Sequence, residues 1–233
     1  MAVQSNYSCY QHSPEHPAPD LPTQNLAALT FEAKVDLFRA SVYGWIFQPS
    51  WELADPDSPI YNGIFSALVI VMTYPEMVAQ FKAGKSSHNA SKRAFVQCLG
   101  EALKVTTTDG MPVSKQEHDS SFEMLYSVVR CGLFHAGRPS KGVVINLEDY
   151  GASIQRLPAL SGEPEQYIVR VRRLIVGFRQ HFDRYIGELK SAASGSTVAT
   201  NFEKHFDNTW AAGPTVVDAK WRGLSKAGSV AQA

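Results

Sequence analysis

The sequence predicts an all-α protein folded as a helical bundle of about four to six helices. Apolar residues recur every three or four positions over several long stretches, which is the spacing of a buried helix face. Proline and glycine separate these stretches and mark the loops between them. The main exception is a β-prone stretch at 142–147, which we expect to pair with 153–157 in a short β-hairpin.

The chain is long enough to bury a sizeable core, with 233 residues and ordinary apolar content. Residues 1–24 are rich in proline and polar side chains, so we expect a disordered N-terminal tail. Residues 25–192 contain the strong helical patterns and form the expected helical domain. Residues 193–233 are rich in Gly, Ala and Ser, which predicts a flexible C-terminal segment with one short helix near Asn201–Ala212.

Composition limits the protein's partners and location. The formal net charge is zero, so nucleic acid would have to bind a local basic patch. The cysteines, Cys9, Cys98 and Cys131, are few and widely spaced, which indicates reduced thiols. No basic and then apolar run opens the sequence, and the apolar run at 64–72 is too short to cross a bilayer. We therefore expect a soluble cytoplasmic protein with no membrane partner.

The first half of the chain predicts four helical stretches. They are Phe31–Phe47, which Pro49 ends; a segment from Gly63; a segment from Glu76 to Gly84; and Ser91–Val105. The segment from Gly63 is apolar on nearly all sides, which is typical of a central core helix, although its β-branched residues also fit a strand.

The most distinctive stretch of the chain lies at the end of a further amphipathic helix. Ser120 and Glu123 form a capping-box pattern, so the helix should begin near Ser121. Gly137 and Pro139 should end it. Its apolar stripe consists of Phe122, Leu125, Tyr126, Val129 and Leu133.

The last turns of this helix carry Arg130 and His135. Five residues apart, they point about 140° away from each other around an ideal helix. A bend at Gly132, the long arginine side chain, or a second copy of the chain would have to bring the two groups together. Both residue types also suit a helix C-terminus for stability alone, because they interact favourably with its carbonyl groups.

The stretch Val129-Arg130-Cys131-Gly132-Leu133-Phe134-His135-Ala136-Gly137 resembles the Arg-x4-His signature of the HEPN superfamily. The following Lys141-Gly142-Val143-Val144-Ile145-Asn146 also looks like the segment found after this motif in HEPN-like proteins, and the resemblance covers about residues 119–147. It implies a homodimeric, metal-independent endoribonuclease of the toxin or defence type, without a cofactor. In many active members Asn, Asp or His directly follows the arginine, where this chain has Cys131.

The resemblance implies roles for the two motif residues. His135 would transfer protons, since a histidine pKa lies near neutrality, and Arg130 would stabilise the charged phosphorane. The products would be a 2′,3′-cyclic phosphate and a 5′-hydroxyl. Further candidates for binding RNA phosphate are Tyr126, Ser127, Cys131, Arg138, Lys141, Arg170 and Arg173.

Two of these candidates lie on a long helix expected from about Glu165 to Lys190. Arg170 and Arg173 would project from its polar side, either as an RNA-phosphate track or simply as a solvated face. Cys131 and His135 also have the spacing of a metal-binding or thiolate–imidazole pair, but no third ligand or orienting carboxylate is apparent.

A second hypothesis belongs to another class of function. The same fold would serve as a catalytically inactive interaction or nucleotide-binding module, with a protein partner such as an antitoxin. Cys131, the zero net charge and the Gly/Ala-rich C-terminal segment favour this interpretation.

Overall fold

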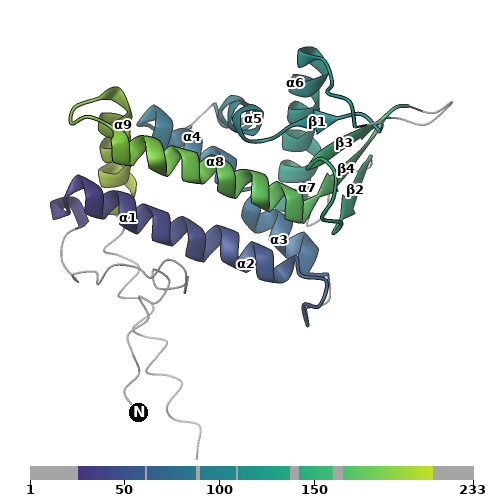
Figure 1. Ribbon diagram of the computed structural model, residues 1–233, viewed down its shortest axis with the longest axis horizontal. Helices are drawn as coiled ribbons and strands as arrows, with labels where there is room; N and C mark the ends of the chain where they lie inside the picture. The colour runs from purple at the N-terminus through teal and green to yellow at the C-terminus, as the bar shows by residue number, and fades with distance from the viewer. Residues whose placement is uncertain are drawn as a thin grey trace, which may run out of the picture.

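Figure 1 shows the computed structural model of the chain, which describes residues 26–60, 62–87, 90–108, 110–136, 142–159 and 165–211. Helices make up most of it, and a four-stranded sheet lies at one end. The helices are α1 (Phe31–Val42), α2 (Gln48–Leu53), α3 (Gly63–Val71), α4 (Tyr74–Ala83), α5 (Ser91–Ala102), α6 (Lys115–Met124), α7 (Cys131–Ala136), α8 (Val171–Ser191) and α9 (Thr197–Phe206). The strands are β1 (Val105–Thr106), β2 (Val143–Asn146), β3 (Ile154–Leu157) and β4 (Gln166–Arg170). The expected disordered tail, 1–24, lies outside the described residues.

The first helix is longer than predicted because Pro49 does not end it. A π-helical turn, η3 (Tyr43–Phe47), joins α1 to α2, and the Gln48 N–H bonds the carbonyl of Tyr43. Proline cannot donate the usual backbone hydrogen bond and crowds the preceding turn. The wider π turn ends directly before Pro49, which then occupies the first turn of α2 without interrupting the helix.

The helix predicted from Gly63 is present as α3, but it is not buried on all sides. Ala67, Leu68 and Val71 face the core, whereas Phe65 is 38 % exposed. The protein core is therefore shared among several helices and is not centred on this one. Within the described part of the chain, only Gly63–Ala83 is long and apolar enough to span a membrane by length and composition, and 44 % of its most apolar window is buried in the protein.

As predicted, α4 begins around Pro75 and ends at Gly84. Gly84 adopts a left-handed conformation with φ of 65°, which a residue without a β-carbon adopts readily. A β-carbon there would also lie 2.9 Å from the Cα of Asn201, which belongs to α9. The glycine therefore both ends α4 and allows α9 to pack closely against it.

The long helix α8 runs beside α1 and α2 through the centre of the protein (Figure 1). It begins at Val171, not near Glu165 as predicted, because residues 166–170 form β4. Its apolar stripe is fully or almost fully buried, as predicted: Val171, Leu174, Ile175, Phe178, Phe182, Tyr185 and Leu189. Helix α8 therefore contributes a large part of the hydrophobic core.

The four strands form one mixed sheet in the order β1-β3-β4-β2. The predicted strands at 142–147 and 153–157 exist as β2 and β3, but the predicted hairpin between them is wrong. Strand β4 lies between them, parallel to β2 and antiparallel to β3. The chain is therefore mostly helical with a small sheet, and the prediction of an all-α protein is confirmed only for the helical part.

The segment after α8 is folded onto the helices through α9. Ser196 caps this helix by accepting a hydrogen bond from the Ala199 N–H, and the helix begins four residues before the predicted Asn201. The Phe202 ring lies 5.5 Å from the ring centroids of both Phe38 and Phe81. The short helix expected in the segment 193–233 is thus present as α9, and residues 212–233 of that segment lie outside the described residues.

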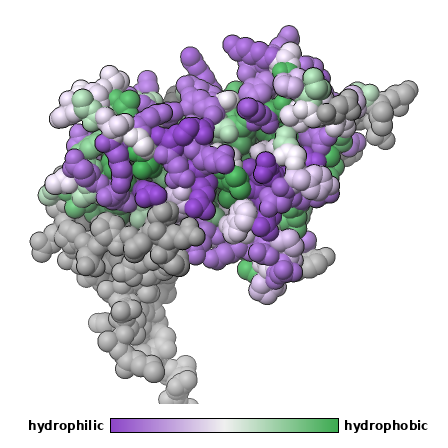
Figure 2. Space-filling model, viewed as in Figure 1, coloured by the Kyte–Doolittle hydropathy of each residue, from purple (hydrophilic) through white to green (hydrophobic). Residues whose placement is uncertain are grey.

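Figure 2 shows the surface of the molecule from the same side as Figure 1. Hydrophilic side chains predominate on this face, and hydrophobic ones appear in separate small areas.

Candidate functional site

The motif helix is one continuous helical run from Lys115 to Ala136, made of α6, the π-helical segment η4 (Leu125–Arg130) and α7. Its start was predicted wrongly. The capping box is formed by Ser114 and Glu117, six residues before the Ser120–Glu123 pattern. The predicted stripe is confirmed, because Phe122, Leu125, Val129 and Leu133 are at most 4 % exposed and Tyr126 is half-buried. Packing of this stripe fixes where the motif residues lie.

Arg130 ends the π-helical segment and contacts α4. Its Nη2 lies 3.0 Å from Oε2 of Glu76, and its guanidinium lies 5.6 Å from the centroid of the Tyr126 ring. The Arg130 side chain remains 25 % exposed. The arginine is thus held in one orientation without being removed from solvent.

Glu76 belongs to a small polar network around Arg130. Ser87 donates a hydrogen bond of 2.6 Å to its Oε1, and Gln80 donates one of 2.8 Å to the Ser87 hydroxyl. Partial burial raises the pKa of Glu76, but the hydrogen bonds from Ser87 and Ser91 and the charge of Arg130 outweigh this and leave it below its ordinary value. Glu76 is therefore a carboxylate at neutral pH, and it opposes the charge of Arg130.

His135 lies in the last turn of α7 and is exposed. Because Cys131–Ala136 is a regular α-helix, Gly132 does not bend it. The two motif residues lie on one continuous helical run, with Arg130 at the end of the wider π-helical segment and His135 in the regular α-helix that follows. A single copy of the chain places Arg130 against Glu76 on α4, whereas His135 is exposed in the last turn of α7.

The neighbouring candidates have local structural partners. Tyr126 packs edge-on against Phe95 at 5.3 Å, as well as against Arg130. The Ser127 hydroxyl donates to the Glu123 carbonyl one turn earlier, at 3.0 Å, so it bonds within its own helix. Cys131 is a half-buried free thiol. Arg138 and Lys141 lie outside the described residues.

The two arginines near the start of α8 hold the segment between β2 and β3. Arg170 is 6 % exposed and donates to the Ala152 carbonyl at 3.2 Å and to the Gln155 amide oxygen at 2.8 Å. Arg173 donates to the Gly151 carbonyl at 3.1 Å. Arg170 therefore does not project from a solvated helix face as predicted. It is the last residue of β4, and its side chain is buried.

The partners of Arg130 were not predictable from the sequence. Glu76 precedes Arg130 by more than fifty residues, and a carboxylate in the first turn of a helix is ordinarily explained by the helix dipole. The sequence also does not reveal a chain of polar contacts that runs from the core to a partly exposed carboxylate. The Tyr74 hydroxyl lies 2.6 Å from Nδ1 of His181, and Nε2 of His181 lies 3.3 Å from Oε2 of Glu101.

Among the described residues, no three His, Cys, Asp or Glu side chains lie close enough together to hold a metal ion. The fold and this site define a mostly helical protein with an ion-paired arginine and an exposed histidine at the end of one helix. Comparison with protein-family models, curated proteins and solved structures finds no match for this chain.

Proposed function

We propose that this protein is a metal-independent endoribonuclease of HEPN type whose active site is completed by a second copy of the chain. The observation that carries the proposal is the setting of Arg130 and His135. Arg130 is oriented by Glu76 yet a quarter exposed, and His135 is exposed at the end of the same helix. Since Arg130 contacts α4 while His135 is exposed at the helix end, a two-fold dimer would supply the opposing pair of groups.

The chemistry would divide between the two residue types. The His135 imidazole would take the proton from a ribose 2′-hydroxyl or deliver one to the leaving 5′-oxygen. The Arg130 guanidinium would bind the non-bridging phosphate oxygens and stabilise the negative charge of the phosphorane. RNA phosphate would have to compete with Glu76 for Arg130, so Glu76 would orient the guanidinium before the substrate arrives.

The test is cleavage of a labelled RNA by the purified protein, with and without a chelator. We expect cutting that survives the chelator and leaves 2′,3′-cyclic phosphate ends. Loss of a general acid–base group costs on the order of 100-fold or more in rate, so His135→Ala should lose at least that much. Its thermal stability should be unchanged because the side chain is exposed.

The matched control is His118→Gln, which changes a histidine on α6 that packs against Phe122. It should keep its activity. Arg130→Ala should lose activity to a similar degree as His135→Ala. Cutting that persists in both motif variants, or that disappears equally in the control, would contradict the proposal.

The second candidate function is a catalytically inactive binding module. One observation favours it: Glu76 pairs with Arg130 at 3.0 Å and opposes its charge. This alternative predicts RNA or partner binding without turnover. It also predicts that His135→Ala binds as well as the wild type in a filter-binding or anisotropy measurement.

A further inference from the structure

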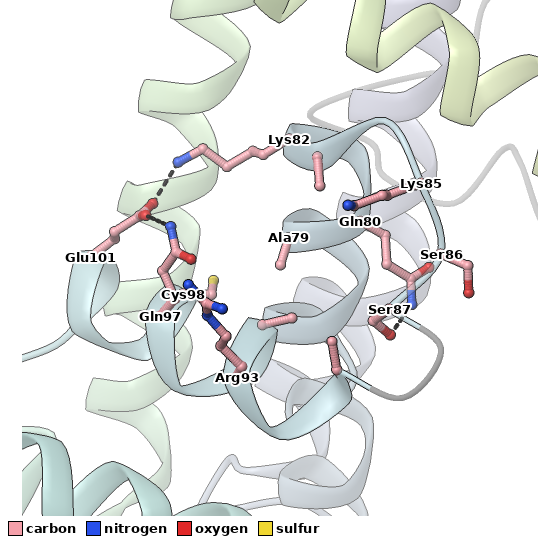
Figure 3. A pocket seen from close by; sticks show the side chains of 13 residues that line it. Ala79, Gln80, Lys82, Lys85, Ser86, Ser87, Arg93, Gln97, Cys98 and Glu101 are labelled. Carbon is pink, nitrogen blue, oxygen red and sulfur yellow. Dashed lines mark hydrogen bonds and ion pairs between the residues drawn. The ribbon is translucent and has the colours of Figure 1, made fainter.

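A second polar site lies in a pocket between α4 and α5. Its volume is about 440 Å³, and it reaches from Ala79 on α4 to Glu101 at the end of α5 (Figure 3). Small-molecule sites in proteins are commonly of this size. The pocket is lined by described residues that include neither Arg130 nor His135, so it is distinct from the motif.

The lining carries an excess of positive charge. Lys82, Lys85 and Arg93 reach the pocket from its two sides, and Glu101 is the carboxylate among the lining residues (Figure 3). Lys82 is ion-paired with Glu101. Within the described part of the chain, Lys85 and Arg93 make no ion pair. In a protein of zero formal net charge, this is a local concentration of cations with two charges not balanced by the lining.

Neutral groups complete the lining in a way that suits binding and not reaction. Gln80, Ser86, Ser87 and Gln97 provide amide and hydroxyl groups, and four alanines add apolar surface to the lining. Burial raises the pKa of the Cys98 thiol, which keeps it protonated and unreactive. The pocket thus offers cations and hydrogen-bond donors around a small apolar surface.

We propose that this pocket binds the phosphate group of a small phosphorylated molecule. A guanidinium presents a planar fork of donors to phosphate oxygens, and the charges of Arg93 and Lys85 together match that of a dianion. The amides and hydroxyls would bond the remaining oxygens, and the alanines of the lining would contact the carbon skeleton. This proposal is independent of ribonuclease activity.

The pocket is also joined to Arg130 by hydrogen bonds. Gln80 and Ser87 line it, Gln80 donates to Ser87, and Ser87 donates to Glu76, the ion-pair partner of Arg130. A ligand that takes a hydrogen bond from Ser87 removes one from Glu76. A ligand in the pocket would therefore change the hydrogen bonding of the carboxylate that orients Arg130.

The experiment measures binding of glucose 6-phosphate and inorganic phosphate to the full chain by calorimetry at low ionic strength, with glucose as the uncharged control. We expect both phosphate probes to bind and glucose not to bind. Arg93→Gln and Lys85→Gln should each weaken binding about tenfold, a typical cost of losing a charge-assisted contact. The side chains of Arg93 and Lys85 are both exposed, so circular dichroism of each variant should show an unchanged fold.

Lys92→Gln is the matched control. It removes one positive charge from the same turn of α5, but Lys92 pairs with Glu123 on α6 and does not line this pocket. It should change affinity less than twofold. Failure of both phosphate probes to bind, or equal weakening by Lys92→Gln, would overturn the proposal, because the second result indicates attraction to overall charge.

Discussion

The ion pair between Glu76 and Arg130 gives the motif arginine a defined orientation. Both side chains are mostly buried, with 18 % and 25 % of their surfaces exposed, and Glu76 has a second hydrogen bond from Ser87. A pair in this setting is screened less than a surface pair but still contacts water. Its contribution to stability should therefore be modest, whereas its effect on the position of the guanidinium should be large.

Glu76→Gln should lower the free energy of unfolding by about 1 kcal/mol at neutral pH. The pKa of Glu76 is below its ordinary value of 4.5, so the carboxylate stabilises the folded state above that pH. The stabilisation is lost as pH falls through the lowered pKa. Urea denaturation should show the difference between wild type and variant shrinking well below pH 4.5. A difference that stays constant with pH would exclude an ionised Glu76 as its source.

His181 contributes a different pH dependence from inside the core. Burial lowers its pKa below the ordinary 6.5, although the Glu101 carboxylate opposes the shift. The unfolded chain then binds more protons than the folded one, so this residue contributes stability at neutral pH that falls as pH drops below about 6.5. Because a carboxylate only accepts, Nε2 carries the proton toward Glu101 and Nδ1 accepts from the Tyr74 hydroxyl.

Replacing His181 with Gln should therefore flatten the loss of stability between neutral and mildly acidic pH. Some slope should remain, because burial also lowers the pKa of His205. Thermal unfolding across this range would measure the effect for both proteins. A variant whose stability falls as steeply as that of the wild type would show that protonation of His181 is not linked to unfolding.

At the scale of the helix, two capping-box patterns look alike in the sequence around α6, and only the first of them caps the helix. Ser114 accepts from the Glu117 N–H at 3.3 Å, and the Glu117 carboxylate accepts from the Ser114 N–H at 2.9 Å. The Ser114 hydrogen bonds lower the pKa of Glu117 to about 2. Ser120 lies inside the helix and is exposed. A capping-box pattern marks a helix start only where the residues before it are not helical. The local sequence alone does not show whether they are.

Ser114→Ala should destabilise the protein by about 1 kcal/mol, the usual cost of losing an N-cap side chain. Ser120→Ala is the internal control and should be neutral or slightly stabilising, because alanine favours the helix interior more than serine. Chemical denaturation of the two variants beside the wild type would check the order. Equal destabilisation by both changes would argue against the observed start of α6.

Helices were predictable from sequence where one apolar stripe decides the structure, as in α1, α5 and α8. The errors came from elements whose partners are far away in the chain. Residues Gln166–Arg170 continue the helical pattern of α8 and become a strand only because β2 and β3 flank them. Parallel pairing of β1 with β3 and of β2 with β4 leaves no hairpin signal in the sequence.

The candidate site follows the same rule. Arg130 and His135 were predictable because one helix carries both. Glu76 and Ser87 were not, since their place beside Arg130 depends on how α4 packs against the motif helix. The π-helical turns at Tyr43–Phe47 and Leu125–Arg130 were missed for a similar reason, because an extra residue in a helix turn leaves the apolar spacing almost unchanged.

For the whole molecule, α9 joins the end of the folded chain to its beginning. Lys34 on α1 is buried and pairs with Asp207, which follows α9, at 2.8 Å. The Phe202 ring is fully buried among Phe31, Phe38, Phe81 and Phe206. The first and last helices therefore share one aromatic cluster. This cluster should make unfolding of the described part of the chain cooperative from end to end.

Phe202→Ala should remove about 3–5 kcal/mol of stability, because it deletes a buried ring and leaves a cavity where the neighbouring rings cannot fully collapse. Val198→Ala is the control on the same helix, since Val198 is 38 % exposed and should change stability only slightly. The decisive measurement follows unfolding by two probes, near-ultraviolet absorption for the aromatic cluster and far-ultraviolet circular dichroism for all helices. If α9 is part of the core, both signals shift together in Phe202→Ala. Loss of the aromatic signal alone, with the helical transition unmoved, would mean that α9 is an appendage and that the cooperative unit ends before it.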